Sequence, residues 1–254
     1  MTQTQEAIVE RQFGPRADAY VQSAVHAAGE DLDALEAIVR RHRPVHALDL
    51  GSGGGHVAYR LAPHVEMVTA SDLSADMMAA VAATAQQRAL ANIYTRAAPA
   101  EHLPFEDNTF DFLACRFSTH HWRDMEAGLR EARRVLRRGA AAVFIDVVSP
   151  GPPALDTHLQ TVELLRDPSH VRDYSAAEWQ AALRRSGFAV RATQTFRLRM
   201  DYPSWVERMR TPPAHREAIR SLQHAASAAV SAHFVIEPDG SFTLDTALFE
   251  AVAA

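Results

Sequence analysis

The chain has 254 residues, enough for one α/β domain that buries roughly 70 to 75% of its unfolded surface. Its formal net charge is -5 and it has no block of five or more Lys or Arg residues, which disfavours nucleic acid or an anionic membrane as partner. The single cysteine, Cys115, excludes an intramolecular disulfide. Because no signal-peptide layout or long apolar span is visible, we expect a cytoplasmic protein.

The N-terminal segment, residues 6–41, has a helical pattern. It is broken at Phe13-Gly14-Pro15, and a second helix carries Leu32, Leu35, Ile38 and Val39 on one face. We expect this amphipathic helix to pack on a sheet.

Between about residues 45 and 150, short apolar runs alternate with helical patterns, which predicts βαβ units on a parallel sheet. The predicted strands are 45–50, 65–70, 92–95, 110–115 and 141–146. The predicted helices between them are 56–63, 74–91 and 124–138, the second with Ser74 as its N-cap.

The last third of the chain is less periodic. Ser175 and Glu178 predict a capping box for a helix over 176–186. A strand over 189–196, a helix over 213–230 and a closing hairpin from Phe234 to Ala253 on the Asp239-Gly240 turn follow. We treat 1–254 as one domain, with a helical segment 1–44, a ligand-binding core 45–150 and substrate-side helices and closing strands over 151–254.

A glycine loop follows the first predicted strand. Gly51, Gly53 and Gly55 leave backbone N–H groups accessible, permit positive φ and let a ligand approach closely. Ligands of open α/β sheets bind beyond the carboxyl ends of the strands. The loop therefore predicts a binding site.

Two carboxylates narrow the choice of ligand. Asp72 ends the second strand, where a carboxylate can accept hydrogen bonds from both hydroxyls of an adenosine ribose. A nicotinamide dinucleotide would satisfy this pattern, but its fingerprint requires glycine where this chain has His56. Asp49, directly before the glycines, suits a ligand with an ammonium group and disfavours a pyrophosphate.

These motifs together resemble a known family. Asp49-Leu-Gly-Ser-Gly-Gly-Gly55, Asp72, Ala100-Glu101-His-Leu-Pro-Phe105 and the run Asp111 to Arg116 are similar to the class I S-adenosylmethionine-dependent methyltransferases, in the type 11, ubiquinone/menaquinone C-methyltransferase-like branch. The resemblance covers roughly residues 45–150. It implies an α/β, Rossmann-like three-layer sandwich with an N-terminal helical lid. Its seven-stranded, mostly parallel sheet would have the order 3-2-1-4-5-7-6 with the last strand antiparallel, an ending that the predicted hairpin fits.

The resemblance also implies S-adenosyl-L-methionine as cofactor and S-adenosyl-L-homocysteine as product. The residues that would contact the cofactor are Asp49 and the backbone of Gly51, Gly53 and Gly55 at the methionine end, Asp72 at the ribose, Leu73 and Met77 on the adenine faces, Ala100 and Glu101 at the adenine edge, Arg116 and Phe117 at the sulfonium, and Tyr20 in the lid. Many relatives carry Asp or a hydroxyl residue where this chain has Pro99, so the backbone near Ala100 must serve the adenine amino group.

Methyl transfer by in-line displacement needs no protein nucleophile, because holding the reactants collinear supplies most of the catalysis. A general base helps when the acceptor loses a proton. His120 and His121, beyond the fourth strand, are the candidates. In an extended segment they would point in opposite directions, so one should reach the cleft. The alternative is that both brace the loop. The polar segment of His170, Arg172 and Tyr174 could cover the acceptor site, but we expect a solvated loop there. Asp146, at the end of the fifth strand, is expected either to contact the substrate or to cap the turn.

We expect no metal site. His42 and His46 straddle Pro44, and the remaining histidines lack ligand spacing. The chain also lacks the Pro-Pro-aromatic strand motif of nucleic-acid amino-methylating enzymes, since it has Cys115-Arg-Phe-Ser118 there. The predicted activity is therefore methylation of carbon, oxygen or nitrogen in a small molecule. A nicotinamide-dependent oxidoreductase and a non-catalytic cofactor-binding module remain alternatives, and the oligomeric state is open.

Overall fold

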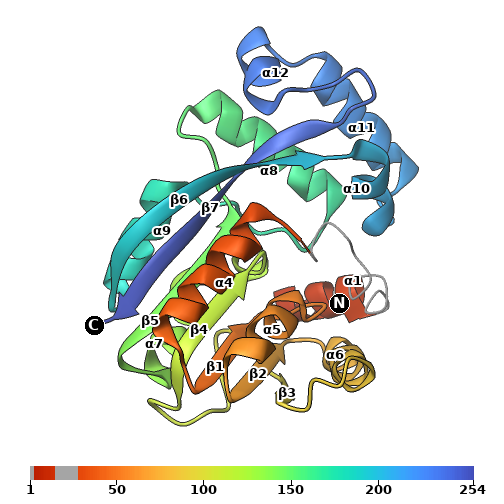
Figure 1. Cartoon of the computed structure of the whole chain (residues 1–254). Coiled ribbons are helices and arrows are strands. Elements are labelled where there is room, and N and C mark those ends of the chain that lie inside the picture. The colour runs from red at the N-terminus through yellow and green to blue at the C-terminus, as the bar shows by residue number, and fades with distance from the viewer. Residues whose placement is uncertain (1–2, 15–27) are drawn as a thin grey trace.

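The computed structural model describes residues 3–14 and 28–254, which form a seven-stranded sheet in the order β3-β2-β1-β4-β5-β7-β6 (Figure 1). The strands are β1 His46–Leu50, β2 Met67–Asp72, β3 Ile93–Ala97, β4 Phe110–Arg116, β5 Leu136–Val147, β6 Phe188–Met200 and β7 Phe242–Ala253. Strand β7 runs antiparallel to β5 and β6, and the pairs among β1 to β5 are parallel. This confirms the expected strand order and the antiparallel last strand.

Helices cover both faces of the sheet because alternate residues of its buried strands are apolar on both sides. In β4, Phe112 and Ala114 belong to the core with α4 (Glu30–His42), α5 (His56–Leu61) and α6 (Ala75–Gln87). Leu113 and Cys115 belong to the opposite core with α7 (Met125–Val135) and α9 (Ala176–Arg185). The result is the expected three-layer sandwich.

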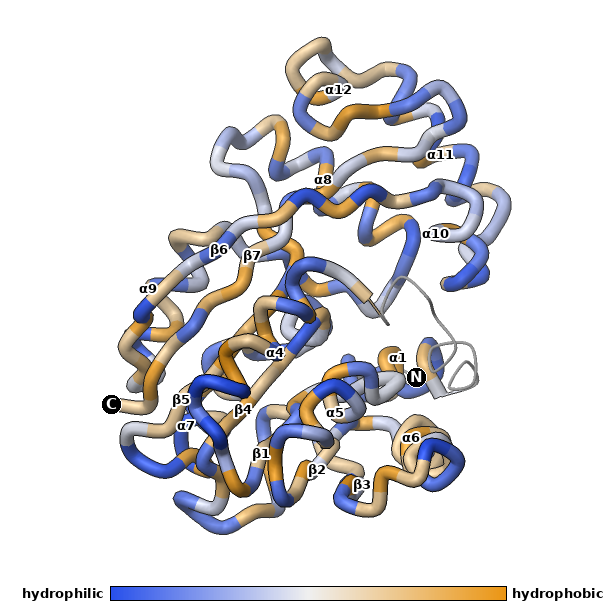
Figure 2. The backbone as a smooth tube through the Cα atoms, viewed as in Figure 1, coloured by the Kyte–Doolittle hydropathy of each residue, from blue (hydrophilic) through white to orange (hydrophobic). Residues whose placement is uncertain are grey.

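A third apolar cluster lies where β6 and β7 extend beyond the other strands of the sheet. It combines strand ends with α8 (Pro153–Arg166), α10 (Tyr202–Arg208), α11 (Pro213–His224) and α12 (Ala228–Phe234), and Trp205 is buried in it. Figure 1 shows these helices together at the upper end of the molecule. Figure 2 shows apolar and polar residues alternating along β6, as expected for a strand with one covered face.

Several predicted boundaries are wrong. Phe234 ends α12 and Val235 takes a left-handed conformation, so no hairpin precedes β7, which pairs with β6 instead. Helix α7 ends at Val135, and β5 begins at Leu136 and continues through Gly139, whose φ is +80°. Helices α8 and α10 lie where no element was predicted. The Ser74 N-cap and the Ser175 capping box are confirmed.

No helix in the ranges 3–14 and 28–254 combines the length and apolar composition that a bilayer span requires.

Candidate active site

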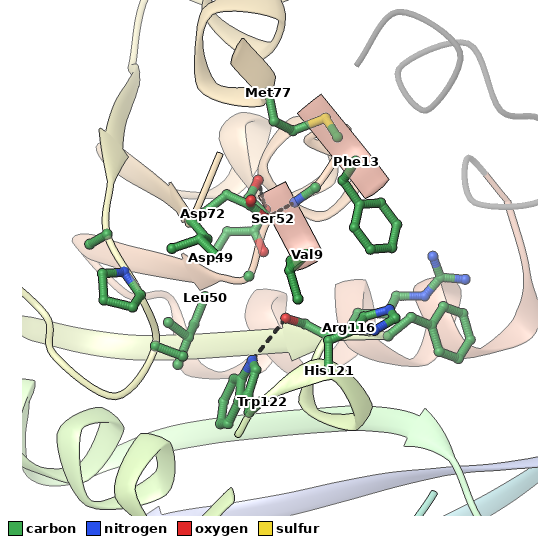
Figure 3. A pocket seen from close by; sticks show the side chains of 18 of the residues that line it. Val9, Phe13, Asp49, Leu50, Ser52, Asp72, Met77, Arg116, His121 and Trp122 are labelled. Carbon is green, nitrogen blue, oxygen red and sulfur yellow. Dashed lines mark hydrogen bonds between the residues drawn. The ribbon is translucent and has the colours of Figure 1, made fainter. Parts of the chain in front are cut away.

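A cavity lies at the carboxyl ends of β1, β2 and β4, and its labelled side chains converge in Figure 3. Its lining comes from the β1 loop, the end of β2, the segment after β3, the end of β4 with the short helix η3 (Thr119–His121), and α1 (Gln5–Phe13). This is the edge at which open α/β sheets bind ligands.

Two glycines of the loop lie so close to other side chains that a Cβ would collide, and a third borders open space. A Cβ on Gly51 (φ +68°) would lie 1.9 Å from Ser118 Oγ, and one on Gly55 (φ +81°) would lie 2.8 Å from the Tyr59 hydroxyl. A Cβ on Gly53 (φ +49°) would have no neighbour within 4 Å. Gly51 and Gly53 line the cavity, whereas the structure does not place Gly55 in its lining. The sequence pattern alone could not distinguish the glycines that line the cavity from the glycine that only packs against Tyr59.

Asp49 is buried beneath the loop. Its Oδ2 accepts hydrogen bonds from Ser52 Oγ at 2.7 Å and from the Ala58 N–H at 2.9 Å. Its Oδ1 is buried without a hydrogen-bond partner among the described residues. Burial raises the pKa of Asp49 to about 7, with a further contribution from Asp72, while the two hydrogen bonds and Arg116 oppose the rise. The cavity therefore presents a buried acceptor to a ligand cation or N–H group.

Asp72 faces the same cavity from the end of β2. Its Oδ2 accepts the Gly53 N–H at 2.9 Å and its Oδ1 accepts the Ser74 N–H at 3.0 Å. Burial raises the pKa of Asp72, and the backbone hydrogen bonds oppose this. Leu73 and Met77 also line the cavity. The bonds fix the orientation of the carboxylate.

The segment after β3 contributes Pro99, Ala100 and Glu101 to the lining. Glu101 Oε1 accepts the N–H of Arg123 at 3.0 Å, so its carboxylate is also a structural link to the loop before α7. Ala98 and Ala100 are buried.

Arg116 and Phe117 lie in the cavity wall at the end of β4. The Arg116 Nε donates to Asp31 Oδ2 at 2.5 Å, and its guanidinium carbon lies 4.4 Å from the centroid of the Phe117 ring. Asp31 was not predicted, because a contact between residues so distant in sequence has no local pattern. Its carboxylate offsets the buried Arg116 charge.

Helix α1 covers part of the cavity with Val9 and Phe13, which Figure 3 shows pointing inward. Gln5 Nε2 donates to the backbone oxygen of Ser169 at 2.7 Å and of His121 at 3.3 Å. These bonds tie α1 to the site. Tyr20, predicted as a cofactor contact, lies outside the described residues.

A second cavity adjoins the first. Phe13, Phe117 and His121 line both cavities and form the wall between them. The second cavity has a volume of about 80 Å³. Its remaining lining residues are His120, Val147, Glu163, Arg166, Asp167, Asp173, Leu198, Met200, Trp205, Arg208 and Leu244. No sequence pattern indicated this cavity, since it is assembled largely from the irregular last third of the chain.

The two candidate histidines lie in η3, not in an extended segment, so the reason for expecting opposite directions is wrong. Their ring centroids are 4.2 Å apart. His121 lines both cavities, whereas His120 lines only the second. His121 Nδ1 lies 3.3 Å from the backbone oxygen of Ser169, and His120 Nδ1 lies 2.6 Å from Asp146 Oδ1.

The histidines differ in charge state. Burial lowers the pKa of His121 to about 4, and the positive charge of His120 contributes. Burial also acts to lower the pKa of His120, but the carboxylates of Asp146, Asp173 and Glu163 outweigh it and raise the value to about 9. These surroundings therefore favour the neutral form of His121 and the charged form of His120.

The segment 167–174 is not the solvated loop that was expected. Asp167, Ser169, His170 and Asp173 are buried. The Val171 N–H donates to the backbone oxygen of His120 at 2.8 Å, which fixes the segment against η3. Among the described residues, His120, Asp146 and Asp173 form one group in which ligand atoms lie within 4.8 Å of one another. The expectation of no metal site considered only spacing along the chain, and the fold brings these residues together from three segments.

Comparison with known proteins agrees with the fold. A family profile described as a methyltransferase domain matches residues 48–144. The Uncharacterized protein YafE of Escherichia coli (strain K12) is 45% identical over 197 residues, which cover 78% of this chain and 95% of that protein. The Ubiquinone/menaquinone biosynthesis C-methyltransferase UbiE of Agrobacterium fabrum (strain C58 / ATCC 33970) is 33% identical over 113 residues, 43% of this chain and 44% of that enzyme.

The Uncharacterized methyltransferase YcgJ of Bacillus subtilis (strain 168) is 34% identical over 221 residues, 87% of each chain. The crystal structure of the YcgJ protein superposes with a TM-score of 0.83 at 30% identity, covering 87% of this chain and 97% of that one. Sequence and fold thus agree over the cofactor-binding core and beyond it. The chain belongs to the class I S-adenosylmethionine-dependent methyltransferases.

Proposed function

We propose that this protein transfers a methyl group from S-adenosylmethionine to a small-molecule acceptor that binds in the second cavity. The observation that carries the proposal is the shared wall of Phe13, Phe117 and His121 between the two cavities. A donor in one cavity and an acceptor in the other would be neighbours at these residues, and in-line transfer would follow where the shared side chains move aside and let the two ligands touch.

The first cavity suits S-adenosylmethionine, which supplies an activated methyl group when bound. The unpartnered Asp49 Oδ1 can accept from its ammonium group, and the open space at Gly53 admits its body beside the loop. Asp72 can accept from the ribose hydroxyls, with Leu73 and Met77 beside the adenine and Ala100 and Glu101 at its edge. Phe13 and Val9 would exclude water from the bound molecule.

The second cavity supports an acceptor with an apolar body and a polar group. Val147, Leu198 and Trp205 contribute apolar surface to its lining. His120 and Asp173 contribute polar groups. The relative named for ubiquinone and menaquinone biosynthesis supports a small-molecule acceptor, because it matches this chain over 113 residues.

We assign the proton-accepting role to His121. If its Nδ1 carries the hydrogen and donates to the Ser169 carbonyl, Nε2 has the free lone pair that a base requires. His120 lines the acceptor cavity and is held by Asp146, so it would contact and orient the acceptor. Arg116, neutralised by Asp31, would hold Phe117 in the wall.

Calorimetric titration with S-adenosylmethionine and S-adenosylhomocysteine tests the first half of the proposal. We expect one ligand per chain, and a loss of affinity of roughly 10- to 100-fold in Asp72→Ala, since two polar contacts to the ribose would be lost. Glu66→Ala is the matched control, because this exposed carboxylate directly precedes the opposite end of β2. No binding to the wild-type chain, or equal binding by Asp72→Ala, would reject the proposal.

Methyl transfer to a panel of small phenols, enols, quinols and amines, followed by mass spectrometry, tests the second half. A product heavier by one methyl group supports the enzyme. Cofactor binding without any product across the panel favours the non-catalytic module instead. Binding of a reduced nicotinamide dinucleotide in place of S-adenosylhomocysteine would favour the oxidoreductase.

A further inference from the structure

A buried group of potential metal ligands lies beside the acceptor cavity. It consists of His120 from η3, Asp146 from the end of β5 and Asp173 from the segment after α8. One ligand atom from each residue lies within 4.8 Å of those from the other two. Imidazole nitrogen and carboxylate oxygen are common ligands of Mn²⁺, Fe²⁺ and Zn²⁺.

The two carboxylates have unused acceptor atoms. Asp146 Oδ1 accepts the Val147 N–H at 2.9 Å and pairs with His120, but Asp146 Oδ2 is buried without a hydrogen-bond partner among the described residues. Asp173 Oδ2 is also buried without such a partner. The residues are only 1% and 2% exposed, so water cannot compensate freely. His170 Nε2 lies 4.0 Å from Asp173 Oδ2, beyond hydrogen-bond distance, so a divalent cation would supply the electrostatic partner that both carboxylate oxygens lack.

The surrounding contacts hold the three residues in place without using those atoms. The side-chain amide of Gln160 makes two hydrogen bonds to the backbone of Asp173. Its Oε1 accepts from the Asp173 N–H at 3.1 Å, and its Nε2 donates to the Asp173 carbonyl oxygen at 2.7 Å. The His120 backbone oxygen accepts from Val171 at 2.8 Å. Such outer contacts orient the ligands of metal sites.

The group also has access to open space. His120 and Asp173 line the second cavity, whose volume of about 80 Å³ exceeds the roughly 10–15 Å³ needed for one water molecule. Three protein ligands beside a cavity leave coordination positions for water or for an oxygen of the acceptor.

From this geometry we propose that His120, Asp146 and Asp173 bind one divalent transition-metal ion, Mn²⁺ or Zn²⁺, with its open coordination positions facing the acceptor cavity. The ion would hold an oxygen or nitrogen of the acceptor, and His120 would act on the acceptor through it. The metal site itself stands independently of the proposed function, whereas its role toward the acceptor rests on that function.

Metal binding to the full chain tests the proposal. Protein stripped with a chelator and dialysed is titrated calorimetrically with MnCl₂ and with ZnCl₂, and its melting temperature is followed in parallel. We expect about one equivalent of Mn²⁺ or Zn²⁺ per chain and a higher melting temperature on saturation. Asp146→Asn and Asp173→Asn should each weaken binding at least about tenfold and abolish the thermal shift, because the amide supplies no charge.

Asp156→Asn is the control. This carboxylate lies near Asp173 and bonds Ser149 and Gln160, but it contributes no ligand atom to the group. It should retain the metal. The two Asn variants preserve side-chain shape. Without metal, Asp173→Asn should melt near the temperature of the wild-type chain, because Asp173 Oδ2 has no hydrogen-bond partner among the described residues, whereas Asp146→Asn should melt lower, because it removes the charged partner of His120.

Two results would overturn the metal site. One is no binding of either ion tighter than about 100 µM to the wild-type chain. The other is binding that persists unchanged in both Asn variants, which would place the ion on other residues. The same samples are titrated with S-adenosylhomocysteine, so a failure of metal binding with normal cofactor binding rejects this site while leaving the proposed function standing.

Discussion

Asp49, buried beneath the glycine loop, is the residue expected to pair with the ammonium group of the ligand. Its Oδ2 is used by Ser52 and Ala58, so only Oδ1 remains for a cation. Since burial raises its pKa to about 7, the residue changes charge near neutral pH. Cofactor affinity should therefore depend on pH through this residue.

We expect the affinity for S-adenosylhomocysteine to fall several-fold between pH 8 and pH 6. As the pH falls through about 7, Asp49 becomes protonated and can no longer pair with the ammonium group. Calorimetry across this range measures the effect. Asp49→Asn should bind more weakly and lose most of the decline, and since the amine of the ligand titrates equally in both proteins, the difference isolates Asp49. Parallel pH profiles for the two proteins would contradict the assignment.

The two histidines of η3 lead to a second prediction at this scale. His120 lies outside the cofactor cavity, so His120→Ala should slow turnover at least several-fold and leave the affinity for S-adenosylhomocysteine intact. His121→Ala should slow turnover by roughly 10²- to 10⁴-fold if the residue is a general base. Single-turnover rates with an acceptor found in the panel measure both. Unchanged turnover in His120→Ala would remove that residue from the mechanism.

Among the elements, α1 has the most direct connection to function. Its Val9 and Phe13 line the first cavity. Hydrogen bonds from Gln5 to the backbone oxygens of His121 and Ser169 fix the helix there. Figure 3 shows both apolar side chains pointing into the first cavity, where we propose that the cofactor binds. The position of α1 favours a covering role for the N-terminal segment.

Removing the aromatic ring of α1 tests this role. Phe13→Ala should increase the dissociation rate of S-adenosylhomocysteine by roughly tenfold, because apolar area buried against the ligand is lost. Stopped-flow displacement measures the rate. Glu10→Ala, on the exposed face of the same helix, should leave it unchanged. An equal dissociation rate in Phe13→Ala and wild type would show that α1 does not cover the ligand.

At the scale of the whole molecule, β5 connects the hydrophobic core of the sheet to the site at its carboxyl end. Its Phe144 is fully buried, with its ring centroid 5.9 Å from that of Trp179 in α9 and 5.5 Å from that of Phe188 in β6. Two residues later the same strand presents Asp146 to His120. The core of the sheet thus positions a residue beside the second cavity, where we propose that the acceptor binds.

Phe144→Ala should lower the free energy of unfolding by about 3–5 kcal/mol, since it leaves a cavity between strand and helix. Urea denaturation measures the change. Arg191→Ala on the exposed side of β6 should change the free energy by less than about 0.5 kcal/mol. A similarly small effect of Phe144→Ala would mean that this contact region can repack.

The sequence predicted those parts of the molecule whose signal is local. The βαβ alternation gave the central strands, and Asp49, Gly51 and Asp72 follow strand ends that must meet at one edge of a parallel sheet. Arg116, His120 and Asp146 lie at or beyond strand ends and could be named from the sequence. Their association with Asp31 and Asp173, which come from distant segments, has no such signal. The predicted hairpin at Phe234 failed because tertiary packing in the third cluster favours a helix there.

The wall shared by the two cavities has a thermodynamic consequence. The same three side chains, Phe13, Phe117 and His121, line both cavities, so a shift of any of them changes both sites at once. A ligand that displaces them in one cavity changes the free energy of binding in the other. Linkage then requires reciprocity: the factor by which the first ligand alters the affinity of the second equals the factor by which the second alters that of the first. The affinity ratio measured by titrating either ligand with and without the other must therefore be the same.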